Sequence, residues 1–403
     1  RSGAQQGPAT VWSDLMTDFA TINLPRILRV GGGASRELVA TLRQLGLESP
    51  LLITDPHMVA CGYSAALEQL LQEAGVDYGL FGECVPDPTT DSVDAALACY
   101  RGGDFDSLVA LGGGSSLDTA KAVAVLALRS GPMRDYKVPH ALDDGLPVVA
   151  IPTTAGTGSE VTRAAVITDS ETGEKMLCMG LGLVPVAALV DYELTLSMPH
   201  RLSADTGLDS LCHALEAYVS RRSNPFTDSV ALTAMRTIWQ NIRTVCREPD
   251  NRPAREAMML AATQGGIAFA NASVTLIHGM SRPLGALFHV PHGLSNAMLL
   301  PEVTAWSLDH ALRRYADSAR FMGVAAATDS DRVAADRLVA GLRSLTAELS
   351  VPTPGAYGID ADAWRESLPL MAEQALASGS PQNNPRVPDA GQIVELYQRV
   401  WAA

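Results

Sequence analysis

The first half of the chain alternates short apolar runs with stretches of helical periodicity. Five of these runs have the length and the bounding residues of strands: 26–30, 50–54, 78–84, 107–111 and 147–151. Strands that alternate with helices are typical of a parallel sheet, because each parallel pair needs a crossover connection and the crossover helices cover both faces. We therefore predict an α/β domain with a parallel sheet at the N-terminal end.

From about residue 198 onward the strand signals disappear and long helical periods replace them. The clearest apolar stripes at helical spacing cover residues 206–221, 227–246, 254–269 and 331–349. Proline resists continuing either a helix or a strand, so the pair Met198-Pro199 marks the boundary between the two patterns. The sequence predicts an α/β domain over residues 1–198 and an all-α domain over residues 199–403.

The charge balance and the cysteine pattern exclude two classes of protein. The chain carries 44 Asp+Glu against 30 Lys+Arg, a formal net charge of −14, whereas a nucleic-acid-binding surface needs a basic excess. The six cysteines form no CxxC pair, which is typical of reduced thiols and not of a disulfide framework. We expect no nucleic-acid partner and a cytoplasmic location.

Two segments resemble targeting signals and need a separate interpretation. Residues 258–277 carry no charge, but Thr263, Gln264 and Asn271 make them a poor lipid-facing helix. We predict one buried helix there and no membrane partner. Residues 1–10 lack an initiator Met and an apolar core, which is typical of a processed or artificial leader.

A run of glycines follows the fourth predicted strand. Gly112, Gly113 and Gly114 precede Ser115 at the start of a helical segment, where glycine lets the backbone approach a phosphate and free N–H groups attract an anion. The spacing is not GxGxxG, and such turns also use glycine for geometry alone. Asp55, after the second strand, suits a ribose 2′-hydroxyl and repels a 2′-phosphate, which favours NAD over NADP. The alternative is a simple Asp-Pro turn.

A second loop, residues 151–160, ends the fifth predicted strand with many hydroxyl groups. Thr153, Thr154 and Thr157 stand there among small residues. Hydroxyl and backbone N–H groups can line a pyrophosphate or nicotinamide pocket without adding charge. The alternative is a loop that only caps the next helix, but its place at the carboxyl end of a parallel strand favours a function.

Four residues in the second half have the chemistry of a metal site. Asp209 and His213 are four residues apart, which puts both on one face of a helix. His278 and His292 each precede a glycine. Three imidazoles and one carboxylate suit Fe(II), Zn(II) or a similar ion. The alternative for Asp209 and His213 alone is an ion pair within a helix. The alternative for each later histidine is a helix cap or a packed core residue. Only the four together indicate a metal.

The longer motifs around these residues resemble the iron-containing (group III) alcohol dehydrogenase family. Matching segments occur in order over nearly the whole chain from about residue 20: 112–121, 152–160, 207–216 and 278–293. The resemblance implies a Rossmann-like nucleotide domain followed by a helical metal-binding domain, the architecture shared with dehydroquinate synthases, and NAD(H) as cofactor. It also implies iron, or zinc as in some relatives, held between the domains by Asp209, His213, His278 and His292.

The same resemblance implies cofactor contacts and an activity. The candidate cofactor-binding residues are Asp55, Asp87, Gly112, Gly113, Gly114, Ser115, Asp118, Thr153, Thr154, Thr157 and Lys175. Asp87 stands where relatives often have Asn, and its charge either strengthens the preference for NAD or only shapes a turn. The implied reaction is hydride transfer between nicotinamide C4 and a small aldehyde or alcohol, neutral or anionic, with the ion as Lewis acid. A homodimer or higher homo-oligomer is expected.

Other activities are compatible with the same motifs. A hydroxyacid–oxoacid transhydrogenase would retain NAD through its cycle, and a dehydroquinate synthase-like lyase would need several basic residues for a phosphate. A scaffold that kept only the fold is disfavoured because all four metal-ligand positions are intact.

Position 282 departs from the family pattern. Many relatives have a second histidine there, to which a proton relay or a contact with the nicotinamide is attributed, whereas this chain has Arg282. Arginine does not release a proton near neutral pH, so the relay role does not transfer. Arg282 is either a structural cation beside Pro283 or a group that binds a carboxylate, sulfonate or phosphonate of the substrate. His289 is the candidate substitute for the relay, with a solvent-facing histidine as the alternative.

Lysine is rare in this chain. Only Lys121, Lys137 and Lys175 are lysines among the thirty cations. The resemblance puts Lys121 and Lys175 in the nucleotide domain, where a compact ammonium is indicated; Lys137 has no assigned role.

Overall fold

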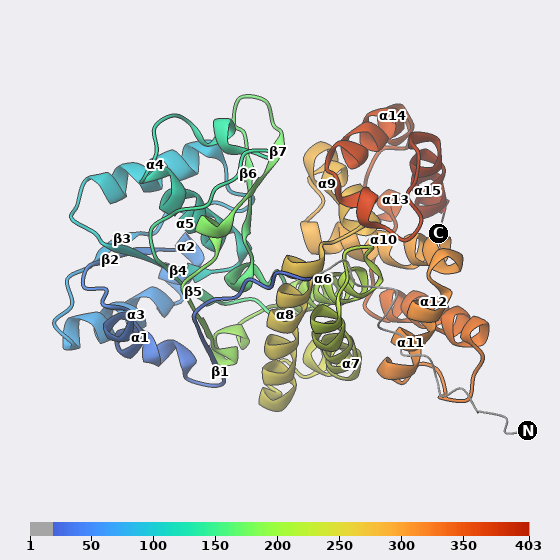
Figure 1. The fold of residues 1–403 in the computed structure, drawn as a ribbon, viewed down its shortest axis with the longest axis horizontal. Coiled ribbons are helices and arrows are strands. Elements are labelled where there is room, and N and C mark those ends of the chain that lie inside the picture. Colours follow the sequence, from blue (N-terminus) through green and yellow to red (C-terminus); the bar gives the residue numbers. More distant parts are fainter. Residues whose placement is uncertain (1–18, 403) are drawn as a thin grey trace, which may run out of the picture.

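The computed structural model describes residues 19–402, which form two lobes (Figure 1). The segment interpreted as a leader, residues 1–10, lies outside the described residues. The N-terminal lobe holds a six-stranded sheet in the order β1-β8-β5-β4-β2-β3, and every neighbouring pair is parallel. Its strands are β1 (Ile27–Val30), β2 (Pro50–Ile53), β3 (Gly79–Phe81), β4 (Ser107–Gly112), β5 (Val148–Pro152) and β8 (Ala187–Val190).

Helices cover both faces of this sheet, so its central strands are apolar throughout. On β4, Leu108 and Ala110 join the core formed with α4 and α5, whereas Val109 and Leu111 join the core formed with α1 and α3. The helices of this lobe are α1 (Leu38–Leu45), α2 (Pro56–Ala60), α3 (Tyr63–Glu73), α4 (Thr90–Arg101) and α5 (Gly114–Leu126). The predicted parallel-sheet lobe is therefore confirmed.

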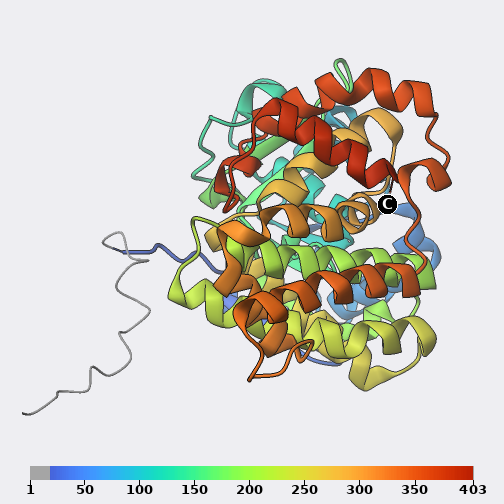
Figure 2. The ribbon, with the colours of Figure 1, turned by 90° about the vertical axis from the view of Figure 1, so that its right-hand side faces the viewer.

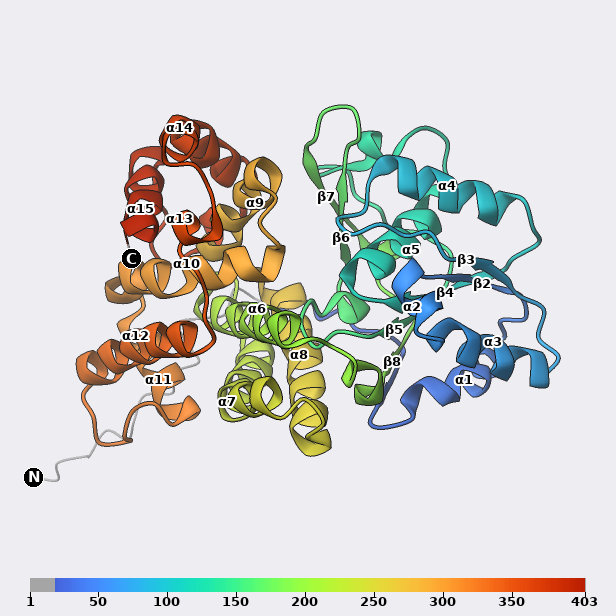
Figure 3. The same cartoon turned by 180° about the vertical axis from the view of Figure 1, so that it is seen from behind.

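The five predicted strands coincide with β1 to β5, although β3 is shorter than residues 78–84. Three strands were missed: β8, and the antiparallel hairpin of β6 (Ala164–Thr168) and β7 (Lys175–Met179). One face of the hairpin, with Ile167 and Met176, packs into the core of α5. Its other face is turned toward the helical lobe, across from α9 (Figure 3).

Within the described residues, the C-terminal lobe contains helices and no strand, as the periodicity predicted (Figure 2). Its α-helices are α6 (His200–Val219), α7 (Pro225–Arg247), α8 (Arg252–Ala272), α9 (Leu276–Phe288), α10 (His292–Ser307), α11 (Leu312–Met322), α12 (Asp331–Glu348), α13 (Pro354–Tyr357), α14 (Ala361–Ala377) and α15 (Ala390–Ala402). α6 starts directly after Pro199; the domain boundary itself stays a prediction.

The prediction of one buried helix over residues 258–277 is wrong, because the segment is broken. α8 ends at Ala272 and α9 begins at Leu276, after a bend of 104°. A buried carboxylate from α6 stabilises the break: Glu216 Oε1 accepts the N–H of Ile277 at 2.7 Å and so satisfies the start of α9. Among the described helices, none is long and apolar enough alone to cross a membrane.

The two lobes touch through backbone at two glycines. A Cβ on Gly158, which has φ of 64°, would lie 2.5 Å from the Cα of Gly266 on α8, and one on Gly266 would lie 2.8 Å from the Cα of Gly158. Beside this contact, the carbonyl of Gly156 accepts the hydroxyl of Ser210 on α6 at 2.9 Å. The loop after β5 therefore rests directly on the helix that carries Asp209 and His213.

Candidate metal centre

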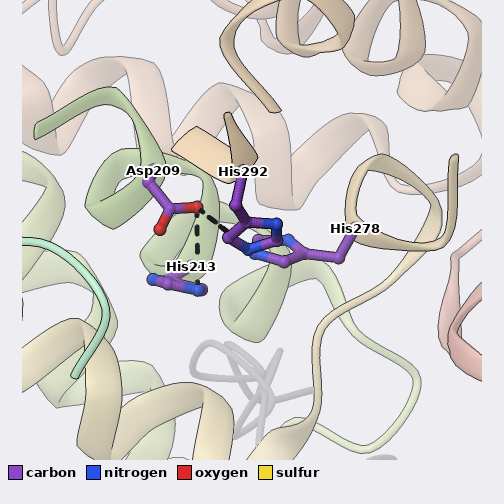
Figure 4. Close-up of side chains that lie close together, drawn as sticks. All are labelled: Asp209, His213, His278 and His292. Carbon is purple, nitrogen blue, oxygen red and sulfur yellow. Dashed lines mark ion pairs between the residues drawn. The ribbon is translucent and has the colours of Figure 1, made fainter. Parts of the chain in front are cut away.

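Three helices of the C-terminal lobe bring the four predicted metal ligands together (Figure 4). Asp209 and His213 lie one turn apart on α6, His278 is in the first turn of α9, and His292 is the first residue of α10. Their donor atoms all lie within 4.8 Å of one another. The structure thus places all four in one cluster, and their role as ligands stays a prediction.

The cluster is organised around one carboxylate oxygen. The Nε2 atoms of His213, His278 and His292 lie 3.8, 3.5 and 3.7 Å from Oδ1 of Asp209. Four ligands at about 2.1 Å from one ion are separated from each other by roughly 3.4 Å. Three of the residues are buried, whereas the His292 side chain is 44% exposed. The donor set therefore fits a divalent ion that can be approached from the His292 side.

An asparagine amide lies among these donor atoms. Nδ2 of Asn296 donates to Oδ1 of Asp209 at 2.6 Å and lies 3.1 and 3.2 Å from the Nε2 atoms of His278 and His292. Its Oδ1 is buried without a hydrogen-bond partner in the described part of the chain. Nδ2 of Asn296 therefore lies within hydrogen-bonding distance of three of the four predicted ligand atoms. Sequence reasoning missed Asn296, although its position four residues after His292 puts both on one face of α10.

A second buried carboxylate orients His278. Oε2 of Glu216 is hydrogen-bonded to Nδ1 of His278, and Oε1 accepts the hydroxyl of Thr275 at 2.8 Å. A carboxylate on Nδ1 fixes the tautomer and leaves the Nε2 lone pair for a metal. Sequence reasoning gave Glu216 no role, although it lies in the matching segment 207–216. Its position one turn after His213 on α6 was the signal that could have identified it.

Burial and charge set the protonation of the cluster. Burial lowers the pKa of His213 to about 4, against the attraction of Asp209, and the pKa of the partly exposed His292 is lowered in the same direction. Burial acts the same way on His278, but the charge of Glu216 and the hydrogen bonds to Asp209 and Glu216 raise its pKa to about 9. Although burial opposes it, the three imidazoles hold the pKa of Asp209 well below its usual range. Near neutral pH, two imidazoles are neutral and can donate a lone pair to a cation.

The predicted phosphate turn lies where β2 and β4 end, at the point where the strand order of the sheet reverses. β4 runs through Gly112, with φ of 144°, and Gly113 into α5, whose first turn has no side-chain cap among the described residues. Its free N–H groups are open to an anion such as a pyrophosphate. Asp55 lies beside the turn: Oδ2 accepts the hydroxyl of Ser116 at 3.1 Å, and Oδ1 caps α2. Its contact with a ribose stays a prediction.

The second predicted loop packs against this turn. A Cβ on Gly114 would lie 3.0 Å from Cγ2 of Thr157, and one on Gly113 would lie 3.4 Å from Cγ2 of Thr154. Thr153 is buried at the end of the same loop. The threonine side chains therefore pack directly on the glycine backbone, and the two predicted loops form one surface.

Three further candidate cofactor residues, Ser115, Asp87 and Lys175, are linked to one another at the edge of this surface. The N–H of Asp87, which has φ of 50°, donates to Oγ of Ser115 at 3.2 Å, and its carboxylate pairs with Nζ of Lys175 at 3.0 Å. Lys175 projects from β7 and reaches α9, since a Cβ on Gly285 would lie 3.1 Å from its Nζ. Lys175 therefore lies between the nucleotide lobe and the metal cluster.

The family model for iron-containing alcohol dehydrogenase matches residues 25–192, and the model for the C-terminal part of that family matches residues 203–401. The chain is 34% identical over 385 residues to an NAD-dependent methanol dehydrogenase from Bacillus methanolicus, covering 95% of this chain and 99% of the relative. The chain belongs to the iron-containing alcohol dehydrogenase family. Lactaldehyde reductase from Escherichia coli (strain K12) is 34% identical over 376 residues, with 92% and 97% covered. A crystal structure of 1,3-propanediol oxidoreductase has a TM-score of 0.91 at 32% identity and covers 95% of this chain and 100% of that one.

This membership confirms the predicted family and fold class, and it makes the protein an NAD-dependent alcohol dehydrogenase, an oxidoreductase. The family implies NAD and a divalent metal. The uncapped start of α5 and the Asp-His cluster fit these two groups.

In this alcohol dehydrogenase, the predicted cofactor residue Asp118 belongs to a buried network around Lys121 and not to the open surface. Lys121 is fully buried, and its Nζ donates to Ser159 Oγ, Thr162 Oγ1 and the carbonyl of Ala164 at 2.8, 2.9 and 3.0 Å. Asp118 accepts the hydroxyl of Ser159 at 2.6 Å and a backbone N–H of β6 at 2.9 Å. Both oxygens of Asp118 are therefore used inside the lobe, and its contact with the cofactor stays a prediction.

Burial dominates the protonation of this network. It lowers the pKa of Lys121 to about 8, against the attraction of Asp118 and Glu160. It raises the pKa of both carboxyls, against the attraction of Lys121. Glu160 also accepts the hydroxyl of Thr263 on α8 at 2.7 Å, which ties the network to the helical lobe.

A cleft of about 960 Å³ lies between the outward face of hairpin β6–β7 and the helical lobe. Phe269 lines it, and the ring of Phe269 stacks on that of His213 with centroids 4.3 Å apart. Leu177 of β7 faces it from the other side. The cleft therefore extends to the ring of Phe269, which lies between it and His213.

The two candidate catalytic residues have different surroundings. Arg282 lines the cleft, and its guanidinium has one hydrogen-bond partner within residues 19–402, the carbonyl of Ser378 at 3.5 Å. Burial lowers its pKa, against the attraction of Glu216. His289 is exposed and ends α9 with φ of 54°, and in the described structure its ring makes no hydrogen bond to the cluster. Both catalytic roles stay predictions.

Proposed function

We propose that this enzyme transfers hydride between NAD(H) and a small aldehyde or alcohol, using a divalent ion held by Asp209, His213, His278 and His292. Iron is the proposed metal, with zinc as the alternative, because three imidazoles and one carboxylate suit both. The observation that carries the proposal is the convergence of three imidazole nitrogens on one buried carboxylate oxygen. The uncapped start of α5 in the other lobe supports the cofactor part of it.

Residues of this chain have distinct proposed roles around the reactants. Glu216 fixes the ring of His278, and the first turn of α5 holds the pyrophosphate. Phe269 covers one side of the cluster and excludes water from it. When bound, the ion supplies a Lewis acid for the carbonyl oxygen, and the nicotinamide supplies or accepts the hydride.

The test combines metal analysis with an aldehyde screen. The protein is stripped with a chelator, reloaded with Fe(II) under anaerobic conditions or with Zn(II), and assayed for NADH oxidation with small aldehydes. We expect one bound ion per chain, loss of activity on stripping and its return on reloading. Full activity of the stripped protein would overturn the metal assignment.

The same assay separates the alternative activities. Turnover between a hydroxyacid and an oxoacid without added NAD, by protein that retains NAD after purification, would identify a transhydrogenase. Absence of any NADH oxidation by the reloaded protein would overturn the proposed reaction. Cytoplasmic location and a homodimer stay predictions.

A further inference from the structure

The cleft between hairpin β6–β7 and the helical lobe has an unusual charge for this protein. Its lining includes four arginines, Arg163, Arg221, Arg222 and Arg282, and a single acidic residue, Asp143. The whole chain has a net charge of −14. Arginines elsewhere commonly pair with carboxylates, but among the described residues none of these four has a carboxylate oxygen within 4.0 Å. The cleft is therefore a local excess of uncompensated positive charge.

Arg282 is the arginine nearest to the chemistry. It follows His278 by one turn of α9, so both side chains project from one face of the helix. Its guanidinium reaches the lining of the cleft, beside Ser378. With one long hydrogen bond to Ser378, most of its donors are unused.

Arg163 faces the same cleft from the nucleotide lobe, and its backbone is held firmly. The buried ammonium of Lys121 binds the residues on either side of it, Thr162 and Ala164. The Arg163 side chain makes no hydrogen bond within the described residues, and its Nε is shielded from solvent without a partner. A guanidinium without hydrogen-bond partners, on a backbone that is held in place, is preorganised to bind an anion.

The phosphates of the cofactor do not account for these arginines. The lining of the cleft includes neither the glycine turn 112–115 nor the loop 153–157. The arginines instead share the cleft with Phe269, whose ring stacks on that of the predicted metal ligand His213.

We infer that Arg163 and Arg282 bind the anionic end of the substrate from opposite walls of the cleft, so that the aldehydes this enzyme prefers carry a carboxylate, sulfonate or phosphonate group. Planar guanidinium groups bind all three oxyanions through paired N–H donors. Arg221 and Arg222, exposed at the edge of the cleft, add attraction for an approaching anion. This inference rests on the proposed hydride transfer and names the substrate class for it.

The first test compares charged and neutral aldehydes in matched variants. NADH oxidation is measured with succinic semialdehyde, sulfoacetaldehyde, phosphonoacetaldehyde and butanal for the wild type, Arg282→Ala, Arg163→Ala and Arg399→Ala. Arg399 is exposed on α15, away from the cleft, and serves as the matched control. The ranking of the three anionic aldehydes in the wild type identifies which oxyanion fits.

We expect kcat/KM for the best anionic aldehyde to fall about 30-fold or more in Arg282→Ala and in Arg163→Ala, the effect of losing a charge-assisted contact. We expect the loss of kcat/KM on butanal to be about 10-fold smaller than the loss on the best anionic aldehyde, because butanal has no group for the guanidinium to bind, and Arg399→Ala to match the wild type. Arg282→Lys should recover part of the loss, because the charge returns without the planar fork. Equal losses on butanal and the anionic aldehydes, or a wild type that prefers butanal, would overturn the inference.

A binding measurement separates failure of this inference from failure of the proposed function. Succinate and phosphonoacetate, which cannot be reduced, are titrated calorimetrically into the NADH-bound wild type and the two alanine variants. Binding by the wild type that both variants lose supports the arginine site even if no aldehyde is reduced. Aldehyde reduction without arginine-dependent binding of either anion would leave the proposed function standing and overturn the arginine site.

Discussion

Each lobe contains one buried cluster of ionisable groups, and the two clusters differ in whether the protein completes them. In the nucleotide lobe, Lys121 lies among two carboxyls and three oxygen acceptors, so its cation is matched from within. In the helical lobe, three imidazole nitrogens and a carboxylate oxygen converge, and no lysine or arginine among the described residues pairs with them. The amide of Asn296 contacts three of these four atoms.

The difference teaches how to separate a structural network from a functional one. Both clusters contain strongly shifted pKa values, so a shifted pKa does not distinguish them. The source of the cation distinguishes them. The Lys121 cluster contains a lysine ammonium, whereas the Asp-His cluster offers ligand atoms to a metal ion from outside the chain. We expect substitutions in the first to change stability and substitutions in the second to change metal content.

The largest expected effect is loss of the metal in Asp209→Asn. The substitution keeps the size of the side chain but removes the one anionic donor that all three imidazoles face. We expect metal affinity to fall by more than the ~10–100-fold that loss of an outer-shell partner costs, with NADH oxidation lost in parallel. The measurement is metal content after dialysis against a competing chelator.

Asp118→Asn is the matched control in the other cluster. It should retain bound metal, because its carboxylate contacts Ser159 and β6 and not the histidines. Equal loss of metal in both variants would remove the distinction between the two clusters.

The next effect is on stability. Lys121→Met replaces the ammonium by an apolar chain of similar length and leaves two buried carboxyls without their cation. We expect the free energy of unfolding in denaturant to fall by about 3 kcal/mol, the scale of breaking a buried ion pair, while metal content per folded chain stays at the wild-type value. Loss of metal without loss of stability would contradict the structural assignment.

Lys121 also predicts a pH dependence of stability. An ordinary lysine keeps its proton up to a pKa of 10.5, whereas the folded protein releases it near a pKa of 8. Between these pH values the unfolded chain binds more protons, so the free energy of unfolding should rise with pH, by up to about 3 kcal/mol over the window. Denaturant titrations of the wild type and Lys121→Met across this range measure it; parallel curves would refute the assignment.

The smallest expected effect tests whether Glu216 orients His278 or binds the metal itself. Glu216→Gln keeps a hydrogen-bond acceptor near His278 but removes the charge. We expect metal affinity to fall by about 10-fold, at the lower end for an outer-shell partner, and the variant to regain metal at higher metal concentration. If Glu216→Gln loses metal as completely as Asp209→Asn, Glu216 is a ligand and not an orienting group.

Sequence patterns predicted most of the architecture and placed the metal cluster, for identifiable reasons. Alternation of strands and helices requires a parallel sheet, and the spacing of Asp209 and His213 requires a shared helix face. The long motifs then linked His278 and His292 to them. The lysine count also pointed to Lys121, although its role is structural.

What the sequence could not supply were contacts between distant segments. The break between α8 and α9 depends on Glu216, sixty residues earlier on α6, and local periodicity carries no trace of that hydrogen bond. Hairpin β6–β7 was missed because its two strands are short and the sequence does not alternate: the partly exposed Val166 and Leu177 are as apolar as their buried neighbours. Arg163 was not considered at all, since its meaning arises only where the hairpin faces Arg282 across the cleft.

The contact of Gly158 with Gly266 has a consequence for how such enzymes diverge. At this point the two lobes meet backbone to backbone, so no side chain separates the loop after β5 from α8. Mutations can accumulate in the flanking cores without altering the relative position of the lobes. The crystal structure of 1,3-propanediol oxidoreductase, with 32% identity and a TM-score of 0.91, is consistent with this expectation: the residues that line the cleft can vary while the arrangement of the two lobes is kept.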